Sequence, residues 1–399
     1  MVGPETKNNH ILISDVTLRK LEDGQELSAN INGEKVWYNF PTEFPVRARP
    51  EPFLPLALFE AMLDNVPVVI DPEFPLSREN LKNLETFQDI MTCWNTDLNK
   101  VDIKATTGEL EPAGENVYCC FSGGVDSTYS YARHQDEITH LLTIQGFDSS
   151  GFNDQVWQDT IGIRKKFADQ EAVRLVHVSS NVRNYCEGRR LPWSPVHGSI
   201  LACLGLTLNA RKLYIPSTFT YNTLFPWGSH PLLDIQWSNE NTEIIHDGLE
   251  AARSQKTAYL TKYQNLLDHI QVCWGSSHSN CGHCPKCVRT SLVLNILGKS
   301  SANLPDYKTH GDIKVLKPAG YTTLAYFDDL IFFAYEHDRH DIVRQLKSMR
   351  KKFVIKHALQ TIGKTLVGNF GKRIYRRLFP ARWTLTRTGI IARNSILDD

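Results

Sequence analysis

The segment from Val117 to Ser127 combines residue types that bind phosphate groups. It begins with the apolar run VYCCF, which predicts a buried strand, and continues as Ser122-Gly123-Gly124-Val125-Asp126-Ser127. Adjacent glycines let consecutive backbone amides point at one spot, and the N-terminus of a following helix adds positive charge there. The two serines supply hydroxyl donors, and Asp126 supplies a carboxylate for a cation. The alternative is an ordinary strand-to-helix turn, where the same residue types are common.

Four cysteines near residue 280 have the spacing of a metal site. They form a C-x7-C-x2-C-x2-C array of Cys273, Cys281, Cys284 and Cys287. Thiolates separated by two residues converge on one ion, and an earlier cysteine completes the tetrahedron of a structural zinc site. An iron–sulfur cluster, which four thiolates also bind, is one alternative to zinc. A second alternative is a set of free buried cysteines that bind no metal.

A parallel sheet is expected to position these groups. Between Val117 and about Leu213, short β-branched or aromatic runs alternate with helical patterns, which predicts parallel strands joined by crossover helices. The expected strands are VYCCF, LLTIQGF, VRLVHVSS and KLYIPS, and helices are expected from Ser127, around 154–168 and from Gly198 to Ala210. Ligands of such sheets bind at the carboxyl ends of the strands, where the glycine loop falls.

The flanking regions have their own patterns. Residues 11–40 predict strands with a hairpin turn at Asn32-Gly33, followed by a helix from Pro55, a strand in VPVVI and a helix around 81–91 introduced by Ser77. We expect an accessory α+β domain at 1–110, the α/β domain at 111–300 with its metal site at 273–287, and a basic helical region at 301–399.

The order of the two motifs is that of a known family. Ser-Gly-Gly-Val-Asp-Ser after an apolar strand resembles the PP-loop of the ATP pyrophosphatase superfamily, and the later cysteine array resembles that of 7-cyano-7-deazaguanine synthases. The resemblance covers about residues 115–298. It implies an adenine nucleotide alpha hydrolase-like fold in which ATP is cleaved between its α and β phosphates. The products would be pyrophosphate and an adenylate of a carboxylate or amide oxygen, which a nitrogen nucleophile then attacks.

The resemblance also implies roles for individual residues. The loop residues Ser122, Gly123, Gly124, Val125 and Ser127 would cradle the ATP phosphates, and Gly146 would lie at the nucleotide. Asp126 would lie near the accompanying Mg²⁺, and Lys256 would be the family's later active-site lysine, preceded by the carboxylate of Asp234. Ser122, Asp126 and Lys256 are the expected catalytic residues, while the zinc would be structural. Arg289, behind the last cysteine, is expected to support the metal loop.

The amino-acid composition excludes several classes of protein. The chain has 399 residues, of which 41% are hydrophobic, and this excludes a disordered or collagen-like protein. Its start lacks a signal-peptide pattern, and no apolar run approaches the roughly 20 residues needed to cross a bilayer. Nine cysteines are too few for a disulfide scaffold of this length, so a reducing cytoplasm is expected.

The overall balance of 44 basic and 44 acidic residues hides two opposite parts. Residues 341–399 hold fourteen basic and three acidic residues, a net charge of +11, which leaves −11 on the rest. Apolar residues recur at helical intervals between these charges. Such a helix fits an anionic membrane surface, a nucleic acid, an acidic partner or the acidic body of the protein itself.

Together these features predict an ATP-dependent ligase that forms an amide or a nitrile from a carboxylate. The long flanking regions keep a second possibility open, a PP-loop enzyme that acts on a macromolecule such as RNA, a glycan or a protein. A third is a protein that binds ATP and a partner without catalysis. Expected cofactors are ATP, Mg²⁺ and Zn²⁺.

Overall fold

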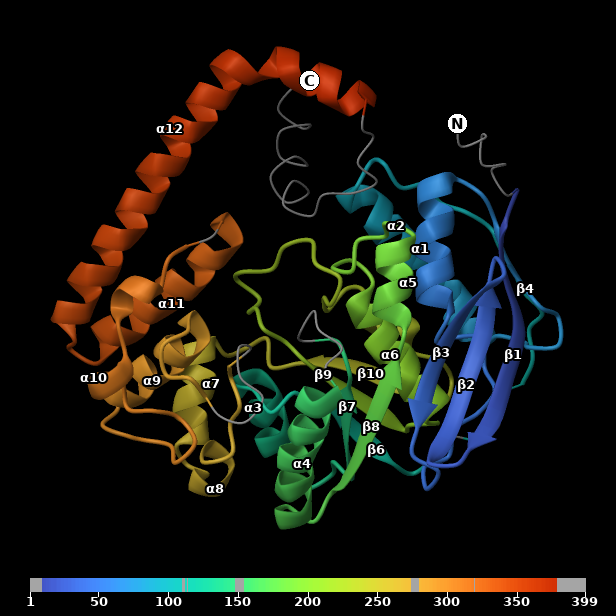
Figure 1. The fold of residues 1–399 in the computed structure, drawn as a ribbon, viewed down its shortest axis with the longest axis horizontal. Helices are drawn as coiled ribbons and strands as arrows, with labels where there is room; N and C mark the ends of the chain where they lie inside the picture. The colour runs from blue at the N-terminus through green and yellow to red at the C-terminus, as the bar shows by residue number, and fades with distance from the viewer. Residues whose placement is uncertain are drawn as a thin grey trace.

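The computed structural model describes residues 9–109, 112, 114–147, 154–273, 280–318 and 320–378, without the side chains of 154, 321–322 and 360–378. Within these ranges, ten strands form one sheet in the order β10-β9-β6-β7-β8-β3-β2-β1-β4-β5 (Figure 1). Most neighbouring strands are parallel, and helices cover both faces, so the predicted α/β class is confirmed at this level.

Residues 11–104 form the predicted β-hairpin and helices. The turn has Asn32 at φ 51° and Gly33 at φ 81°, the left-handed pair that a two-residue hairpin requires. The predicted cap at Ser77 is confirmed, because its Oγ accepts the amide N–H of Asn80 at 2.9 Å. The elements are β1 (Ile11–Leu21), β2 (Gly24–Ile31), β3 (Glu34–Phe40), α1 (Leu54–Asp64), β4 (Val68–Ile70), α2 (Arg78–Trp94) and β5 (Ile103–Lys104).

The central region alternates strands and helices as predicted. Its elements are β6 (Val117–Cys120), α3 (Val125–Arg133), β7 (His140–Ile144), α4 (Asp154–Gln170), β8 (Arg174–Ser180), α5 (Val182–Gly188), α6 (His197–Thr207), β9 (Lys212–Pro216), a 3-10 turn η1 (Asp234–Trp237) and β10 (Glu243–Asp247). The helix expected from Ser127 begins two residues earlier, because Gly124 is its N-cap. All five strands are parallel in the order β10-β9-β6-β7-β8, so the winding direction reverses between β6 and β9.

The N-terminal strands extend this same sheet. β3 pairs antiparallel with β8 through Tyr38 opposite Ser180 and Asn39 opposite Ser179. One buried apolar cluster runs from Ile13 in β1 through Tyr118 in β6 to Leu213 in β9. The strands and helices between residues 11 and 104 therefore share a sheet and a core with the central region, and a boundary at residue 110 stays a prediction.

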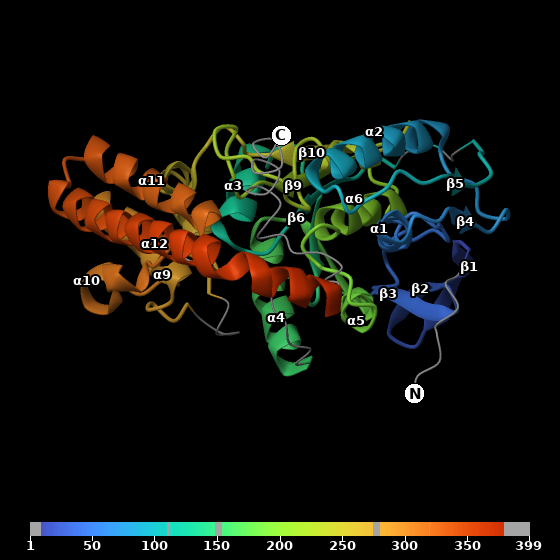
Figure 2. The ribbon, with the colours of Figure 1, turned by 90° about the horizontal axis from the view of Figure 1, so that it is seen from above.

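The C-terminal third is helical and lies at the opposite end of the molecule from β1–β3 in both views (Figures 1 and 2). Its elements are α7 (Arg253–Leu260), α8 (Gln264–Leu267), α9 (Pro285–Ile296), α10 (Tyr307–His310), η2 (Ile313–Val315), α11 (Tyr321–Glu336) and α12 (His340–Leu378). Phe333 of α11 and Leu346 of α12 are buried in one cluster with Leu292 of α9. In the described part of the chain, no helix has the length and apolar character needed to cross a membrane.

Candidate functional site

The glycine loop lies where the sheet reverses its winding. Ser122, Gly123 and Gly124 connect β6 to α3, and β6 has β7 on one side and β9 on the other. In open α/β sheets, ligands bind outside the carboxyl ends of the strands at this reversal. The amides of the first turn of α3 have no partner within the helix and carry the positive end of its dipole. The loop therefore has the position and polarity of an anion site.

The loop is held in a defined shape by its own serines. Gly123 has φ +74°, a conformation that residues with a side chain rarely adopt, so glycine is required there. The Oγ atoms of Ser122 and Ser127 lie 3.3 Å apart, and the Ser122 amide N–H donates to Ser127 Oγ at 3.3 Å. The Arg164 guanidinium of α4 donates to the Ser122 carbonyl at 2.9 Å. Both predicted serines thus sit at one point beside the helix terminus.

Asp126 lies among basic side chains. Its Oδ2 accepts from Arg253 Nη1 at 2.8 Å and from Thr218 Oγ1 at 3.3 Å, and its Oδ1 lies 3.6 Å from Lys256 Nζ. Burial raises the pKa of Asp126, but the charges of Arg253, Lys256 and Lys286 outweigh this and hold the pKa below its ordinary value. Asp126 is therefore an ionised carboxylate in a basic environment.

Lys256 is almost fully buried beside Asp126. Its side chain is 1% exposed, and its ammonium donates to the Ser217 carbonyl at the end of β9. Burial lowers the pKa of Lys256, while the charge of Asp126 opposes that shift. The structure thus brings Lys256 to the glycine loop, as the resemblance implies, although Lys256 lies 129 positions after Ser127 in the chain.

The C-terminal helices reach the same cluster. Arg289 of α9 lies with its guanidinium carbon 4.0 Å from the ring centre of Tyr326 in α11, and burial together with the charge of Arg253 lowers the Arg289 pKa to about 10. The charges of Arg253 and Asp126 both act on Arg289, and its expected role in supporting the metal loop stays a prediction. Asp329 of α11 accepts the Ser254 amide N–H at 3.0 Å at the start of α7.

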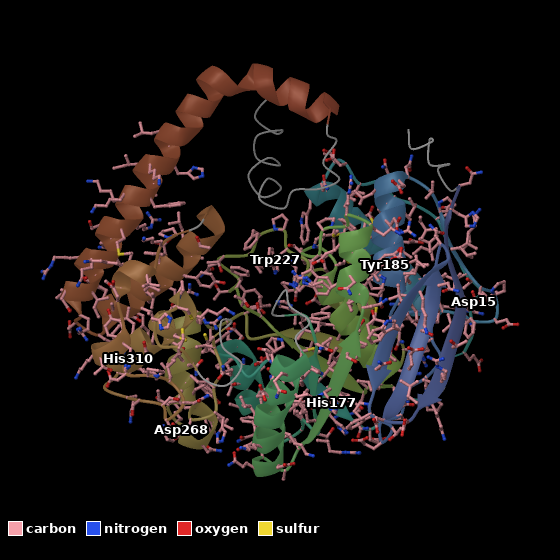
Figure 3. All side chains as sticks on the ribbon, in the orientation of Figure 1. Asp15, His177, Tyr185, Trp227, Asp268 and His310 are labelled. Atoms are coloured by element: carbon pink, nitrogen blue, oxygen red, sulfur yellow. The ribbon has the colours of Figure 1, made fainter. Side chains whose placement is uncertain are left out.

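A cavity of about 220 Å³ opens beside the loop. Its walls come from the carboxyl ends of β6, β7, β9 and β10, from the loops that follow β6, β7 and β9, and from α4 and α6, and Trp227 lies in these central loops (Figure 3). The lining includes Ser122, Asp126, Ser127, Ile144, Phe147, Arg164, His197, Phe219, Phe225, Trp227, His230 and His246. Gly146 lies in the turn after β7 with φ +80° and is not among the described residues that line the cavity, so its expected place at the nucleotide stays a prediction.

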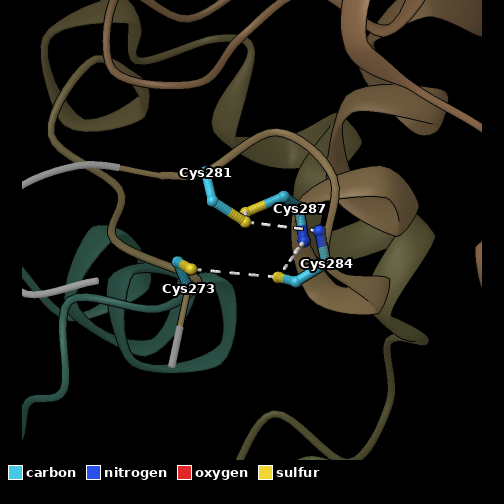
Figure 4. A group of neighbouring side chains, drawn as sticks. All are labelled: Cys273, Cys281, Cys284 and Cys287. Atoms are coloured by element: carbon cyan, nitrogen blue, oxygen red, sulfur yellow. Dashed lines mark hydrogen bonds between the residues drawn. The ribbon is translucent and has the colours of Figure 1, made fainter. Parts of the chain in front are cut away.

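The four predicted metal ligands converge (Figure 4). The Sγ atoms of Cys273, Cys281, Cys284 and Cys287 all lie within 4.8 Å of one another, and the Cys281–Cys287 and Cys273–Cys284 sulfur distances are both 3.9 Å. A tetrahedral ion with metal–sulfur bonds of about 2.3 Å needs sulfur–sulfur distances of roughly 3.8 Å. These sulfurs are too far apart for disulfides, and their spacing fits a single metal ion bound by four cysteines.

The cysteine site is linked directly to the glycine loop. The Gln271 amide N–H donates to the Gly123 carbonyl at 2.7 Å, two residues before Cys273. Cys284 is the N-cap of α9, and Lys286 and Arg289 project from the first turns of that helix. Residues on both sides of the cysteine cluster therefore contact or electrostatically influence the loop region.

Two residues of the site, Arg164 and Tyr326, were not predicted from the sequence. Arg253 lies three residues before the expected Lys256, and a helix places both on one face. Arg164 and Tyr326 carry no such signal, because their positions depend on how whole helices pack.

Comparisons of the chain with protein-family models, curated proteins and solved structures gave no match. Its membership of the PP-loop superfamily therefore remains a prediction based on motifs and their placement.

Proposed function

We propose that this protein is an ATP-dependent ligase of the PP-loop type. It would adenylate a carboxylate or amide oxygen, release pyrophosphate, and transfer the activated group to a nitrogen nucleophile with release of AMP. One observation carries the proposal. The glycine loop stands at the reversal point of the sheet, with Arg253, Lys256 and Lys286 acting on Asp126 beside it.

Each part of this arrangement has a role in such a reaction. The loop amides and the α3 terminus bind phosphate oxygens, and the Ser122 and Ser127 hydroxyls donate to them. Arg253 and Lys256 neutralise the charge that gathers on pyrophosphate as it leaves, which is where catalysis of phosphate chemistry gains most. Asp126 would hold Mg²⁺, which neutralises phosphate charge when bound.

The cysteine site fits zinc better than other metals. Zn²⁺ prefers four thiolates in a tetrahedron, and a site with four protein ligands has no open position for a substrate. The role proposed for the metal is therefore structural, holding the segment before Cys273 and the start of α9 against the glycine loop.

The test is exchange of labelled pyrophosphate into ATP, measured with deazaguanine carboxylate and with a panel of aromatic and aliphatic carboxylates. At least one carboxylate should support exchange in the wild type. Asp126→Ala and Ser122→Ala should reduce this rate by about 100-fold or more, because each removes a group at the phosphates. Asp328→Ala, which breaks an exposed aspartate–arginine pair between α11 and α12, is the matched control and should retain the rate.

Two results would contradict the proposal. One is the absence of carboxylate-dependent exchange with every compound, together with ATP binding, which would favour a non-catalytic nucleotide-binding protein. The other is full exchange in both site variants, which would move the reaction away from this loop.

The proposal also includes the class of carboxylate substrate and the protein surface that would bind it. The basic segment 341–399 would hold the protein against an anionic membrane surface, a nucleic acid or an acidic partner, so a macromolecular carboxylate is a candidate substrate beside small ones. Copurification of RNA that is lost on deleting residues 341–399 would favour an RNA-modifying enzyme.

A further inference from the structure

A buried aspartate–histidine pair borders the cavity through its histidine. His246 in β10 and Asp234 in η1 are joined by a hydrogen bond of 2.7 Å between Nδ1 and Oδ2, and their side chains are 3% and 0% exposed. Asp234 also accepts from Ser229 Oγ at 2.8 Å and from the His230 amide N–H at 3.2 Å. Three donors therefore fix the carboxylate, and the carboxylate fixes the imidazole.

This hydrogen bond determines which ring nitrogen can accept a proton. An ionised Asp234 only accepts, so Nδ1 of His246 carries the proton and Nε2 keeps its lone pair. Within the described part of the chain, no protein group hydrogen-bonds to Nε2. His246 lines the same cavity as Ser122 and Asp126. An oriented imidazole with a free lone pair thus borders the space next to the glycine loop.

The loop that carries Asp234 is closely packed, so its backbone has little room to move. A Cβ atom on Gly228 would lie 2.0 Å from the Ser194 carbonyl oxygen, and one on Gly198 would lie 2.4 Å from the Gly228 carbonyl oxygen. Two glycines therefore let this loop lie directly on the start of α6. The contact holds Ser229 and Asp234 behind His246.

We propose that His246, oriented by Asp234, is the general base of the second half-reaction, and this inference rests on the proposed ligase function. The nitrogen nucleophile attacks the adenylated carbon with its lone pair, and the bond from that carbon to the AMP oxygen breaks. AMP leaves with the bonding electrons. The proton lost by the nitrogen goes to Nε2 of His246 and is later released to water.

The neighbouring His230 is not suited to this role. Its Nδ1 accepts the Leu232 amide N–H at 3.1 Å, so the neutral ring carries its proton on Nε2 and has no second lone pair to offer. Burial, followed by the charge of His246, lowers the pKa of His230 to about 4. His230 is therefore a neutral hydrogen-bond donor near Asp234 and leaves His246 as the acceptor.

The experiment separates the two half-reactions. Pyrophosphate exchange reports adenylate formation, and amide formation with ammonium chloride reports transfer, both with a carboxylate that supports exchange in the wild type. His246→Asn keeps a donor towards Asp234 and removes Nε2. It should retain exchange within about threefold and lose transfer to ammonia by about 100-fold, the size of a general-base effect. Hydroxylamine is a weaker base than ammonia, so its nitrogen loses a proton more readily after attack and depends less on a general base. The rate of transfer to hydroxylamine should therefore fall much less.

A second histidine–aspartate pair provides the matched control. His134 Nε2 lies 3.0 Å from Asp247 Oδ1, and neither side chain lines the cavity, so His134→Gln should leave both half-reactions unchanged. If His246→Asn fails to fold, Asp234→Asn replaces it, because an asparagine amide turned to Nδ1 reverses the ring's hydrogen bond. In Asp234→Asn too, the rate of transfer to ammonia should fall more than the rate of pyrophosphate exchange.

The outcomes distinguish this inference from the proposed function. Normal transfer to ammonia in a folded His246→Asn that still exchanges pyrophosphate would overturn the role of His246 and leave the ligase intact. Equal losses of exchange and transfer would assign the pair a structural role. No exchange in the wild type would overturn the ligase and this inference with it.

Discussion

At the scale of single residues, the Arg253–Asp126 pair is a largely buried ion pair whose loss should destabilise the protein. The two side chains are 9% and 14% exposed, and removing one partner of a buried pair destabilises a protein by about 3 kcal/mol. Arg253→Met should lower the free energy of unfolding by roughly this amount at pH 7, measured by urea denaturation. The Asp126 pKa should rise in the variant.

The stabilisation that Arg253 gives through Asp126 should depend on pH. Because the folded-state pKa of Asp126 is lowered, its ionised form stabilises the protein above the unfolded pKa, and this contribution disappears as the pH falls through the folded value. The difference between wild type and Arg253→Met should therefore shrink in acid. Arg350→Met, which breaks the exposed pair with Asp328, should change the free energy of unfolding by less than about 1 kcal/mol. A pH-independent difference would assign Arg253 a packing role.

At the scale of elements, the cysteine site and the glycine loop should respond together. The Gln271 amide N–H donates to the Gly123 carbonyl, and Cys284 is the N-cap of α9, which carries Lys286, whose charge acts on Asp126. Removing the metal with a chelator should therefore weaken ATP binding by at least tenfold, measured by titration calorimetry with metal content determined in parallel. Cys93→Ser changes an exposed cysteine outside the array and should leave metal content and ATP affinity unchanged. Unchanged ATP affinity in the metal-free protein would separate the two sites.

Helices, strands and turns could be predicted where the local sequence pattern determines them. The strand–helix alternation from Val117 to Leu213, the Asn32-Gly33 turn and the cysteine spacing are each set by neighbouring residues. β10 was missed, because its five residues EIIHD lack the apolar run that marks the other central strands. The His246–Asp234 pair depends on β10 and on a loop packed against α6, so its geometry follows from contacts distant in sequence.

At the scale of the whole molecule, the joining of the two sheet regions could not be predicted. The Trp37 amide N–H donates to Asn181 Oδ1 at 2.8 Å, and Ser180 Oγ donates to the Trp37 carbonyl at 2.8 Å. These residues lie more than 140 positions apart, and nothing in either segment specifies the other. The polar stretch 106–116 predicts a linker, and the described strands on either side of it share one sheet and one core.

The opposite charges of the body and the C-terminal segment lead to a prediction at the same scale. The first turns of α12 are part of the fold, because Ile342, Val343 and Leu346 are buried and Arg350 bonds to Asp328 at 2.6 Å. A chain ending at residue 359 keeps these contacts and should unfold at the wild-type temperature with unchanged ATP affinity. It loses eight basic and two acidic residues, a net charge of +6.

Binding of the two chains to vesicles containing phosphatidylserine tests what the removed charge does. The full chain should sediment with these vesicles at low salt and be released as the salt concentration rises, because screening weakens attraction to an anionic surface. The shortened chain should bind several-fold less, and neither should bind neutral phosphatidylcholine vesicles. Equal binding by both chains would place the attraction in the remaining basic residues of α12. Failure of the full chain to bind, with a lower unfolding temperature of the shortened chain, would show that the segment serves the protein's own acidic body.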